Sequence, residues 1–197
     1  MQYITKQNAI PKIYQDELED FMFSREFPWS IVHESLDNGT QFSAGFSHLA
    51  INDGPINPKG TTATPVVSRL LPISYVMGEI LGKSVKKILR IRAGLLLPSN
   101  NVTRDRTPEV SFTLGGDDAH VDFMMPHYTG LYYVNDSDGD TIVYNEKQQS
   151  TEYTEMTRSS PEKGKIFIFD GEHFHASSKP TNSYARIVLT YNFTVNE

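Results

Sequence analysis

From residue 85 to the end of the chain, apolar and polar residues alternate with a period of two, which is the pattern of half-buried strands. In VKKILRIRAGLLL (residues 85–97), Leu89 and Ile91 alternate with Arg90 and Arg92. Further strand candidates follow at 130–135, 141–145, 165–170 and 186–194. Turn residues such as Asp170-Gly171 separate them, and no helical pattern lies between them. Short strands punctuated in this way predict an antiparallel sandwich or barrel.

The first part of the chain has helical periodicity instead. Residues 13–24 place apolar side chains on one helical face, and residues 66–81 repeat them at helical spacing before Gly82, a plausible C-terminal stop. Pro72 indicates a kink or a helix start. The Gly-, Asn- and Pro-rich stretch 38–60 is expected to be mostly loop. We therefore predict one domain over 1–197, with helical and loop support in 1–84 and a β core in 85–197.

The acidic run DSDGD at 136–140 resembles a calcium-binding loop only in part. The EF-hand pattern requires Gly at its sixth position and Glu at its twelfth, where this chain has Thr141 and Lys147. We interpret the run as a hairpin turn.

Composition excludes several classes of protein. The chain has no Cys, so it can form neither disulfides nor a thiolate metal site. No apolar run reaches the roughly 18 residues of a membrane span, and the N-terminus lacks the apolar core of a signal peptide, so we expect a cytoplasmic protein without membrane contact. The net charge of −6, without a Lys/Arg run, argues against a nucleic-acid partner but does not exclude one.

Two residues in AHVDFMMPH (119–127) could bind a metal ion. His120 and Asp122 are two positions apart, so on a strand both side chains point to the same face. A third ligand could come from His173 or His175. Two histidines and one carboxylate form the facial arrangement of non-haem Fe(II) oxygenases, although Zn²⁺ accepts the same ligands. A His-x-Asp triplet alone is common at strand ends, and His127 fits a loop position better than a ligand position.

Arginines on the strands could bind an anion. Arg186 begins the otherwise apolar strand RIVLTYNF and is either a rim salt bridge or a buried clamp for a carboxylate. Asn192 shares its face but lies about 20 Å further along. Arg90 and Arg92 share one face of their strand; that face either lines a pocket or is exposed to solvent.

The order of these motifs resembles a known family. The residues are His120-x-Asp122, LYYVN at 131–135, GDT at 139–141, His175 and Arg186. Over residues 88–194 they resemble the 2-oxoglutarate- and Fe(II)-dependent dioxygenases, and most closely the prolyl-4-hydroxylase-like branch, which includes small stand-alone members carried by phages. The resemblance implies a double-stranded β-helix, or jelly roll.

The resemblance also implies roles for individual residues. His120, Asp122 and His175 would hold Fe(II), while Arg186 and Tyr133 would bind the distal carboxylate of 2-oxoglutarate and O₂ would take an open metal position. Tyr132 points to the other face and is expected to pack in the core.

The implied reaction is hydroxylation of a C–H bond in a prolyl residue, another peptide residue or a small molecule, with succinate and CO₂ as co-products. A phage-encoded member would act in the host cytoplasm. The alternative is a cupin-like jelly-roll module that binds metal, or serves a structural role, without oxidative chemistry. A zinc hydrolase is disfavoured, because no clear general base lies beside the predicted site.

Overall fold

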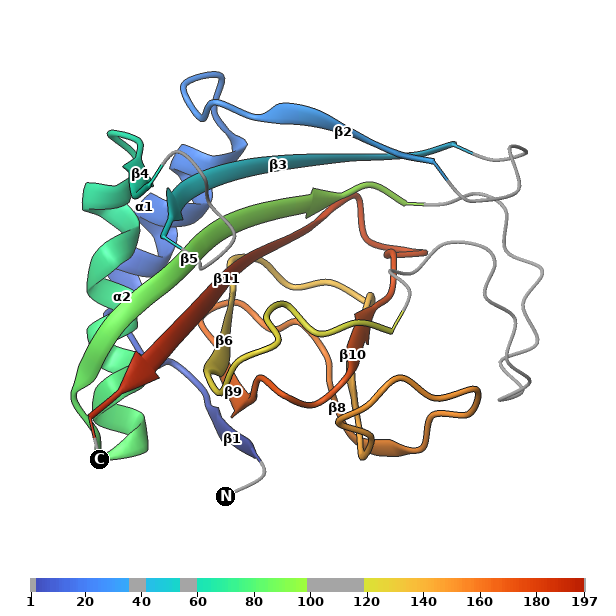
Figure 1. Cartoon of the computed structure of the whole chain (residues 1–197). Helices are drawn as coiled ribbons and strands as arrows, with labels where there is room; N and C mark the ends of the chain where they lie inside the picture. The colour runs from blue at the N-terminus through green and yellow to red at the C-terminus, as the bar shows by residue number, and fades with distance from the viewer. Residues whose placement is uncertain (1–2, 36–41, 54–59, 99–118, 197) are drawn as a thin grey trace.

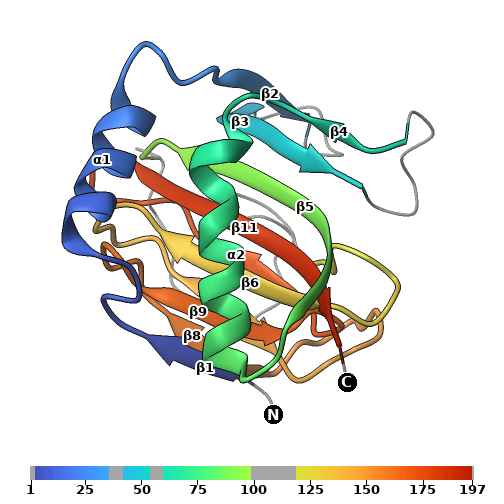
Figure 2. The same ribbon diagram turned by 90° about the vertical axis from the view of Figure 1, so that its left-hand side faces the viewer.

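Two antiparallel sheets pack against each other, and two helices cover the outer face of the larger sheet (Figures 1 and 2). The computed structural model describes residues 3–35, 42–53, 60–98 and 119–196. Strand residues far outnumber helical residues in the described chain, and every pairing between named strands is antiparallel. This arrangement confirms the predicted mainly β, jelly-roll class with supporting N-terminal helices.

The larger sheet has the strand order β1-β9-β6-β11-β5-β3-β2, and β4 pairs with β3. In that order the strands span Tyr3–Lys6, Ile166–Asp170, Tyr128–Tyr133, Arg186–Val195, Val85–Leu96, Phe42–Asn52 and Ser30–Ser35, with β4 at Thr62–Ala63. The smaller sheet has the order β10-β7-β8, at His175–Ser177, Thr141–Tyr144 and Glu155–Ser159.

Helices α1 (Lys12–Phe23) and α2 (Val67–Leu81) lie side by side across the large sheet (Figure 2). α2 runs through Pro72 rather than starting there, and it ends at Gly82, whose φ of 65° is the left-handed conformation that glycine adopts without strain. Among the described residues, no helix is long and apolar enough to cross a membrane.

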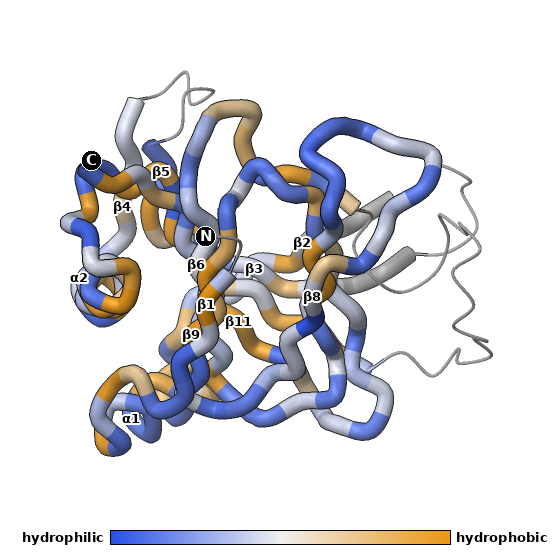
Figure 3. The backbone as a smooth tube through the Cα atoms, turned by 90° about the horizontal axis from the view of Figure 1, so that it is seen from below, coloured by the Kyte–Doolittle hydropathy of each residue, from blue (hydrophilic) through white to orange (hydrophobic). Residues whose placement is uncertain are grey.

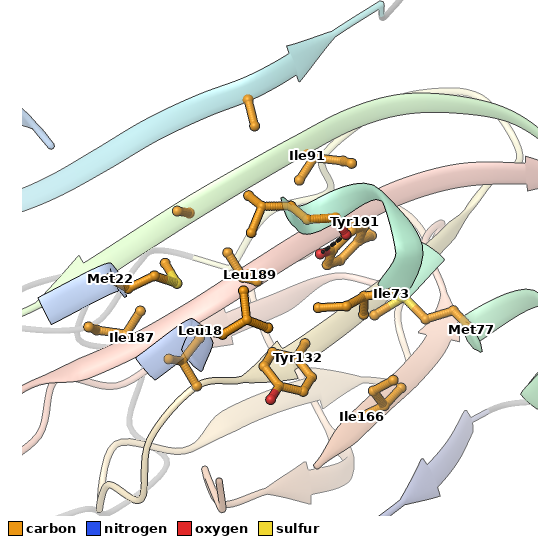
Figure 4. Packing of buried hydrophobic residues seen from close by; sticks show 14 of the residues in the cluster. Leu18, Met22, Ile73, Met77, Ile91, Tyr132, Ile166, Ile187, Leu189 and Tyr191 are labelled. Atoms are coloured by element: carbon orange, nitrogen blue, oxygen red, sulfur yellow. Dashed lines mark hydrogen bonds between the residues drawn. The ribbon is translucent and has the colours of Figure 1, made fainter. Parts of the chain in front are cut away.

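The main hydrophobic core lies between these helices and the sheet (Figure 4). It takes one side of β11, namely Ile187, Leu189, Tyr191 and Phe193, as the period-two pattern predicts. Tyr132 lies in the same core, fully buried, which confirms its expected packing role. Hydrophobic positions accordingly concentrate in the central strands, whereas long stretches of the peripheral loops are hydrophilic (Figure 3).

A second, smaller core lies between the two sheets. It consists of Leu131, Tyr133, Val143, Phe167, Phe169 and Val188. The alternate residues of β6, β9 and β11 therefore face two different interiors, so these strands are largely buried on both sides. The inner face is the one that carries the candidate site.

Two predictions about local structure are wrong. Residues 42–52, expected to be loop, form the long strand β3, because β5 and β2 supply backbone hydrogen bonds on both of its edges. Residues 136–140 are not a hairpin turn: β6 belongs to the large sheet and β7 to the small one, so the segment crosses between sheets. The first 84 residues therefore contribute strands as well as helices. Residues 38–41 and 54–59 of the expected loop lie outside the described residues.

Candidate metal centre

His120 and His175 are held opposite each other by an isolated antiparallel bridge. The N–H of His120 donates to the carbonyl of His175 at 3.0 Å, and the N–H of His175 donates back to that of His120 at 2.9 Å. Directly opposed residues of an antiparallel pair project their side chains to the same face. The two imidazole rings accordingly lie with centroids 4.7 Å apart.

Asp122 completes the cluster. Its Oδ1 lies 3.8 Å from Nε2 of His120, and its Oδ2 lies 3.8 Å from Nε2 of His175. One donor atom from each of the three residues lies within 4.8 Å of the others. Two imidazole nitrogens and one carboxylate oxygen at this spacing fit a first-row divalent metal ion and leave coordination positions for other ligands.

The imidazole of His175 is oriented and neutral. Its Nδ1 lies 3.2 Å from the carbonyl of His173, so Nδ1 carries the proton and Nε2 presents its lone pair to the cluster. Burial lowers the pKa of His175 to about 4, because its surroundings disfavour the imidazolium more than the Asp122 carboxylate favours it. A neutral imidazole is the form that binds a metal ion.

Asp122 is fixed by two donors from neighbouring strands of the large sheet. A guanidinium N–H of Arg90 donates to Oδ1, and Nδ2 of Asn192 donates to Oδ2 at 2.7 Å. Arg90 also donates from Nε to Oδ1 of Asn192 at 3.0 Å. Burial alone would raise the pKa of Asp122, but Arg90, His175 and Asn192 favour the carboxylate and together lower the pKa well below its ordinary value. Each carboxylate oxygen retains a lone pair for a metal ion.

The other two histidines of interest lie outside this cluster. His173 is buried with its Nδ1 2.8 Å from the carbonyl of Tyr144. His127 contacts the carbonyl of Met125 with Nδ1 and the hydroxyl of Thr129 with Nε2. Of the alternatives left open by the sequence, the structure therefore brings together His120, Asp122 and His175.

Arg186 lies buried at another part of the same cavity. Its Nε donates to the carbonyl of Gly139 at 2.6 Å, and its Nη2 donates to the hydroxyl of Thr141 at 2.7 Å. Arg186 is therefore buried rather than at the rim, and its role as a carboxylate clamp stays a prediction. The GDT motif at 139–141 thus supplies the acceptors that orient the guanidinium.

Tyr133 contacts Thr141, which lines the cavity, but does not line the cavity itself. Its hydroxyl lies 3.1 Å from the Thr141 hydroxyl and 3.3 Å from the carbonyl of Ser159. Burial raises the pKa of Tyr133, so the phenol stays protonated. The side chain is fully buried and is not among the cavity-lining residues, whereas Thr141 is. A direct contact of Tyr133 with a bound carboxylate stays a prediction.

One cavity joins these groups. It is lined by Arg90, Arg92, His120, Asp122, Thr141, His175 and Arg186, and by small or apolar residues including Gly45, Gly94, Leu131 and Val188. Arg90 and Arg92 therefore face the cavity rather than solvent, the first of the two readings of that strand. Phe123 is buried beneath the Arg90 guanidinium, whose carbon lies 5.3 Å from the ring centroid.

Sequence reasoning missed two residues of the site. Asn192 is far from Arg186, as strand spacing predicts, but it anchors Asp122, which comes from a remote segment. Thr141 joins Arg186 to Tyr133. A buried polar residue on the inner face of an apolar strand was the available signal for Asn192, because such groups require a partner.

No protein-family model and no curated protein sequence matches the chain. The fold, in contrast, matches solved structures. A 2OG-Fe(II) oxygenase family oxidoreductase from Burkholderia pseudomallei is similar, with a TM-score of 0.68 and 10% identity over 98% of this chain and 85% of that chain. The α-ketoglutarate-dependent epimerase SnoN from nogalamycin biosynthesis has a TM-score of 0.64 and 11% identity, covering 98% of this chain and 77% of that chain.

A prolyl hydroxylase from Trichoplax adhaerens, in complex with a peptide fragment of a hypoxia inducible factor degradation domain, has a TM-score of 0.57 and 12% identity over 98% of this chain and 83% of that chain. All three similarities extend over nearly the whole of this chain. The chain therefore has the fold of solved 2-oxoglutarate- and Fe(II)-dependent oxygenases.

Proposed function

We propose that this chain is a 2-oxoglutarate- and Fe(II)-dependent dioxygenase that hydroxylates a C–H bond and releases succinate and CO₂. One observation carries the proposal. A single cavity, in a fold shared with such oxygenases, contains both a cluster of two imidazoles with one carboxylate and the buried guanidinium of Arg186. A metal cluster and an anion clamp in one cavity are what a metal-chelated dicarboxylate requires.

In this proposal His120, Asp122 and His175 hold Fe(II). The neutral imidazole of His175 and the ionised carboxylate of Asp122 are ready to coordinate without losing a proton first. Arg90 and Asn192 hold the carboxylate in place and balance part of its charge. When bound, Fe(II) with 2-oxoglutarate and O₂ supplies the oxidising chemistry, which the side chains of the protein cannot supply themselves.

Arg186 binds the distal carboxylate of 2-oxoglutarate. Its guanidinium is already oriented by Gly139 and Thr141, so little side-chain entropy is lost when the anion binds. Tyr133 assists by way of Thr141, since its hydroxyl and Nη2 of Arg186 both contact the Thr141 hydroxyl. These groups position 2-oxoglutarate while apolar residues such as Leu131 and Val188 exclude water from the cavity.

The substrate is proposed to be a prolyl residue, another peptide residue or a small molecule. The similar prolyl hydroxylase is bound to a peptide, which supports the first reading, while the similar epimerase acts in the biosynthesis of a small molecule. We also propose that residues 1–197 act as one dioxygenase domain, because strands from both parts of the chain pair in one sheet. A cytoplasmic location, in the host cell if a phage encodes the chain, stays a prediction from the sequence.

An anaerobic titration tests the proposal. Fe(II)-loaded protein is titrated with 2-oxoglutarate and the visible charge-transfer band of the chelate is followed. We expect a saturable band, and conversion of 2-oxoglutarate to succinate once O₂ is admitted. A folded, Fe(II)-loaded protein that gives no band would contradict the dioxygenase and leave the cupin-like module, for which metal binding without a 2-oxoglutarate response is the expected result.

A further inference from the structure

The three arginines of the cavity have different surroundings. Arg90 donates hydrogen bonds to Asp122 and Asn192, and Arg186 donates hydrogen bonds to Gly139 and Thr141. For Arg92, which lines the same cavity, no hydrogen bond or ion pair is found within residues 3–35, 42–53, 60–98 and 119–196. A guanidinium offers five N–H donors, so a cavity-facing one without an acceptor is available to a ligand.

The position of Arg92 separates it from the proposed cosubstrate clamp. On β5, Arg92 is paired with Thr190 of β11, four residues from Arg186, which is about 13 Å at strand rise. Arg90, two residues away in the other direction, is paired with Asn192 beside Asp122. Arg92 therefore lies on the stretch of strand between the anchor of the metal cluster and Arg186.

The cavity also has room beside Arg92. Gly94 is the next residue of β5 on the same face, and a Cβ added there would meet only the carbonyl oxygen of Val188, at 3.9 Å. On the neighbouring strand β3, Gly45 also lines the cavity. The absence of a side chain at Gly94 leaves space for an organic group next to the Arg92 guanidinium, whereas Gly45 is paired with Leu96 and widens the cavity at the level of Arg186.

The charges of the cavity favour a further anion. Among the described lining residues, three guanidinium groups face one carboxylate, Asp122. Adding a divalent metal ion and the two carboxylates of 2-oxoglutarate leaves the positive charges in excess by two. Both carboxylates are used in the proposed function, one at the metal and one at Arg186. A low-dielectric cleft with excess charge of one sign concentrates ligands of the opposite sign, here within a chain whose net charge is −6.

We propose that Arg92 binds a carboxylate or phosphate group of the organic substrate, so that the enzyme acts on an anionic molecule. This inference rests on the proposed function for the identity of the reaction, but the anion site itself does not depend on it. A guanidinium pairs with either group through two parallel hydrogen bonds, which would fix the substrate at one end while the reacting carbon lies toward the metal.

The test uses inorganic phosphate and acetate as probes. ¹⁵N-labelled protein, both metal-free and loaded with Zn(II) and 2-oxoglutarate, is titrated while the arginine Nε–H signals are followed by NMR. The Arg92 signal is assigned as the one that is absent from the spectrum of Arg92→Gln. In the wild-type protein we expect this signal to shift saturably as the probe is added. We also expect the anion affinity, followed at the Gly94 amide, to fall about tenfold or more in Arg92→Gln. Arg25→Gln, which removes an exposed guanidinium remote from the cavity, should have no effect.

A second measurement distinguishes whether Arg92 binds the organic substrate or the cosubstrate 2-oxoglutarate. Affinity for 2-oxoglutarate should be unchanged in Arg92→Gln and reduced in Arg186→Gln. If Arg92→Gln weakens the binding of 2-oxoglutarate as strongly as Arg186→Gln does, Arg92 binds the cosubstrate and the proposal is overturned. It is also overturned if neither probe shifts the Arg92 signal.

The two proposals can fail separately. A response to phosphate in metal-free protein without 2-oxoglutarate binding would contradict the dioxygenase but not the anion site. Should Arg92→Gln fail to fold, Arg92→Lys keeps the charge but loses the planar fork, and it should retain only part of the anion affinity.

Discussion

His120 and His175 exchange two backbone hydrogen bonds in an isolated antiparallel bridge, and this bridge sets their imidazoles side by side. The backbone rather than side-chain packing therefore fixes the distance between the two proposed metal ligands. Asp122, two residues after His120, is instead held in the cluster by the side chains of Arg90 and Asn192.

Removing one imidazole should abolish tight metal binding. We expect His175→Ala to lower Fe(II) or Zn(II) affinity by more than about 100-fold, because loss of even an outer partner of a ligand costs roughly 10- to 100-fold. His173→Gln is a matched control, since His173 is equally buried two residues away but lies outside the cluster. Isothermal titration with each metal measures the effect; equal loss in both variants would refute the assignment.

Asn192 should matter to the metal although it is not a proposed ligand. Asn192→Ala removes the donor to Oδ2 of Asp122 and the acceptor of Arg90 Nε. We expect metal affinity to fall by about 10- to 100-fold and unfolding to become easier by about 1–3 kcal/mol. Asn196→Ala, which loses only a contact with Ser84 at the surface, is the control for both measurements. Unchanged metal affinity in Asn192→Ala would mean that Asp122 needs no support.

Arg186 and Tyr133 should differ in their effect on 2-oxoglutarate. Arg186→Gln removes the charge-assisted pair with the distal carboxylate, so the affinity for 2-oxoglutarate should fall by about 10- to 100-fold while the affinity for the metal ion stays constant. Tyr133→Phe removes only the hydroxyl that contacts Thr141, and we expect a loss of about fivefold. Titration of the Fe(II) form measures both. A larger effect for Tyr133→Phe than for Arg186→Gln would indicate that the tyrosine, not the arginine, is the main anion ligand.

Gly139 should be intolerant of a side chain. A Cβ there would lie 2.9 Å from Cδ of Arg186 and would collide with the carbonyl of Ser178. We therefore expect Gly139→Ala to destabilise the fold by about 1–3 kcal/mol and to weaken 2-oxoglutarate binding by displacing Arg186. Gly94→Ala, with only an ordinary van der Waals contact, should change the free energy of unfolding little. Denaturant unfolding compares the two, and similar stabilities would argue against the close approach at Gly139.

Asp138 should stabilise the chain in a pH-dependent way. Burial alone would raise the pKa of its carboxyl group, but hydrogen bonds from Thr181, Asn182 and Ser183 lower the pKa below its ordinary value of 3.8. The stabilisation is therefore complete above about pH 4 and is lost as the pH falls further and the carboxylate becomes protonated in the folded state.

The corresponding variant is Asp138→Asn. We expect it to lower the free energy of unfolding by about 1–3 kcal/mol at pH 7 and by less at pH 2 to 3. Asp20→Asn, an exposed position on α1, controls for the change in net charge. Chemical unfolding at both pH values gives the comparison. A loss that is the same at both pH values would show that the charge of Asp138 is not involved.

The fold class could be predicted because periodicity depends only on neighbouring residues. Alternation along 186–194 assigned Ile187 and Leu189 to one face and Arg186 and Val188 to the other, and the structure agrees. The strand at 42–52 could not be recognised in the same way. It has glycine and polar residues that favour loops locally, and it is a strand because β2 and β5 bind its two edges.

By itself, the sequence determined the alternating strands, the two helices and the set of residue types that could hold a metal ion. Only the tertiary structure showed His175, and not His173, beside His120 and Asp122, paired Arg90 with Asp122, and left Arg92 facing the cavity without a described partner. The physical reason is that periodicity fixes the face on which a side chain lies, whereas the identity of its partner depends on which distant strand the sheet places beside it.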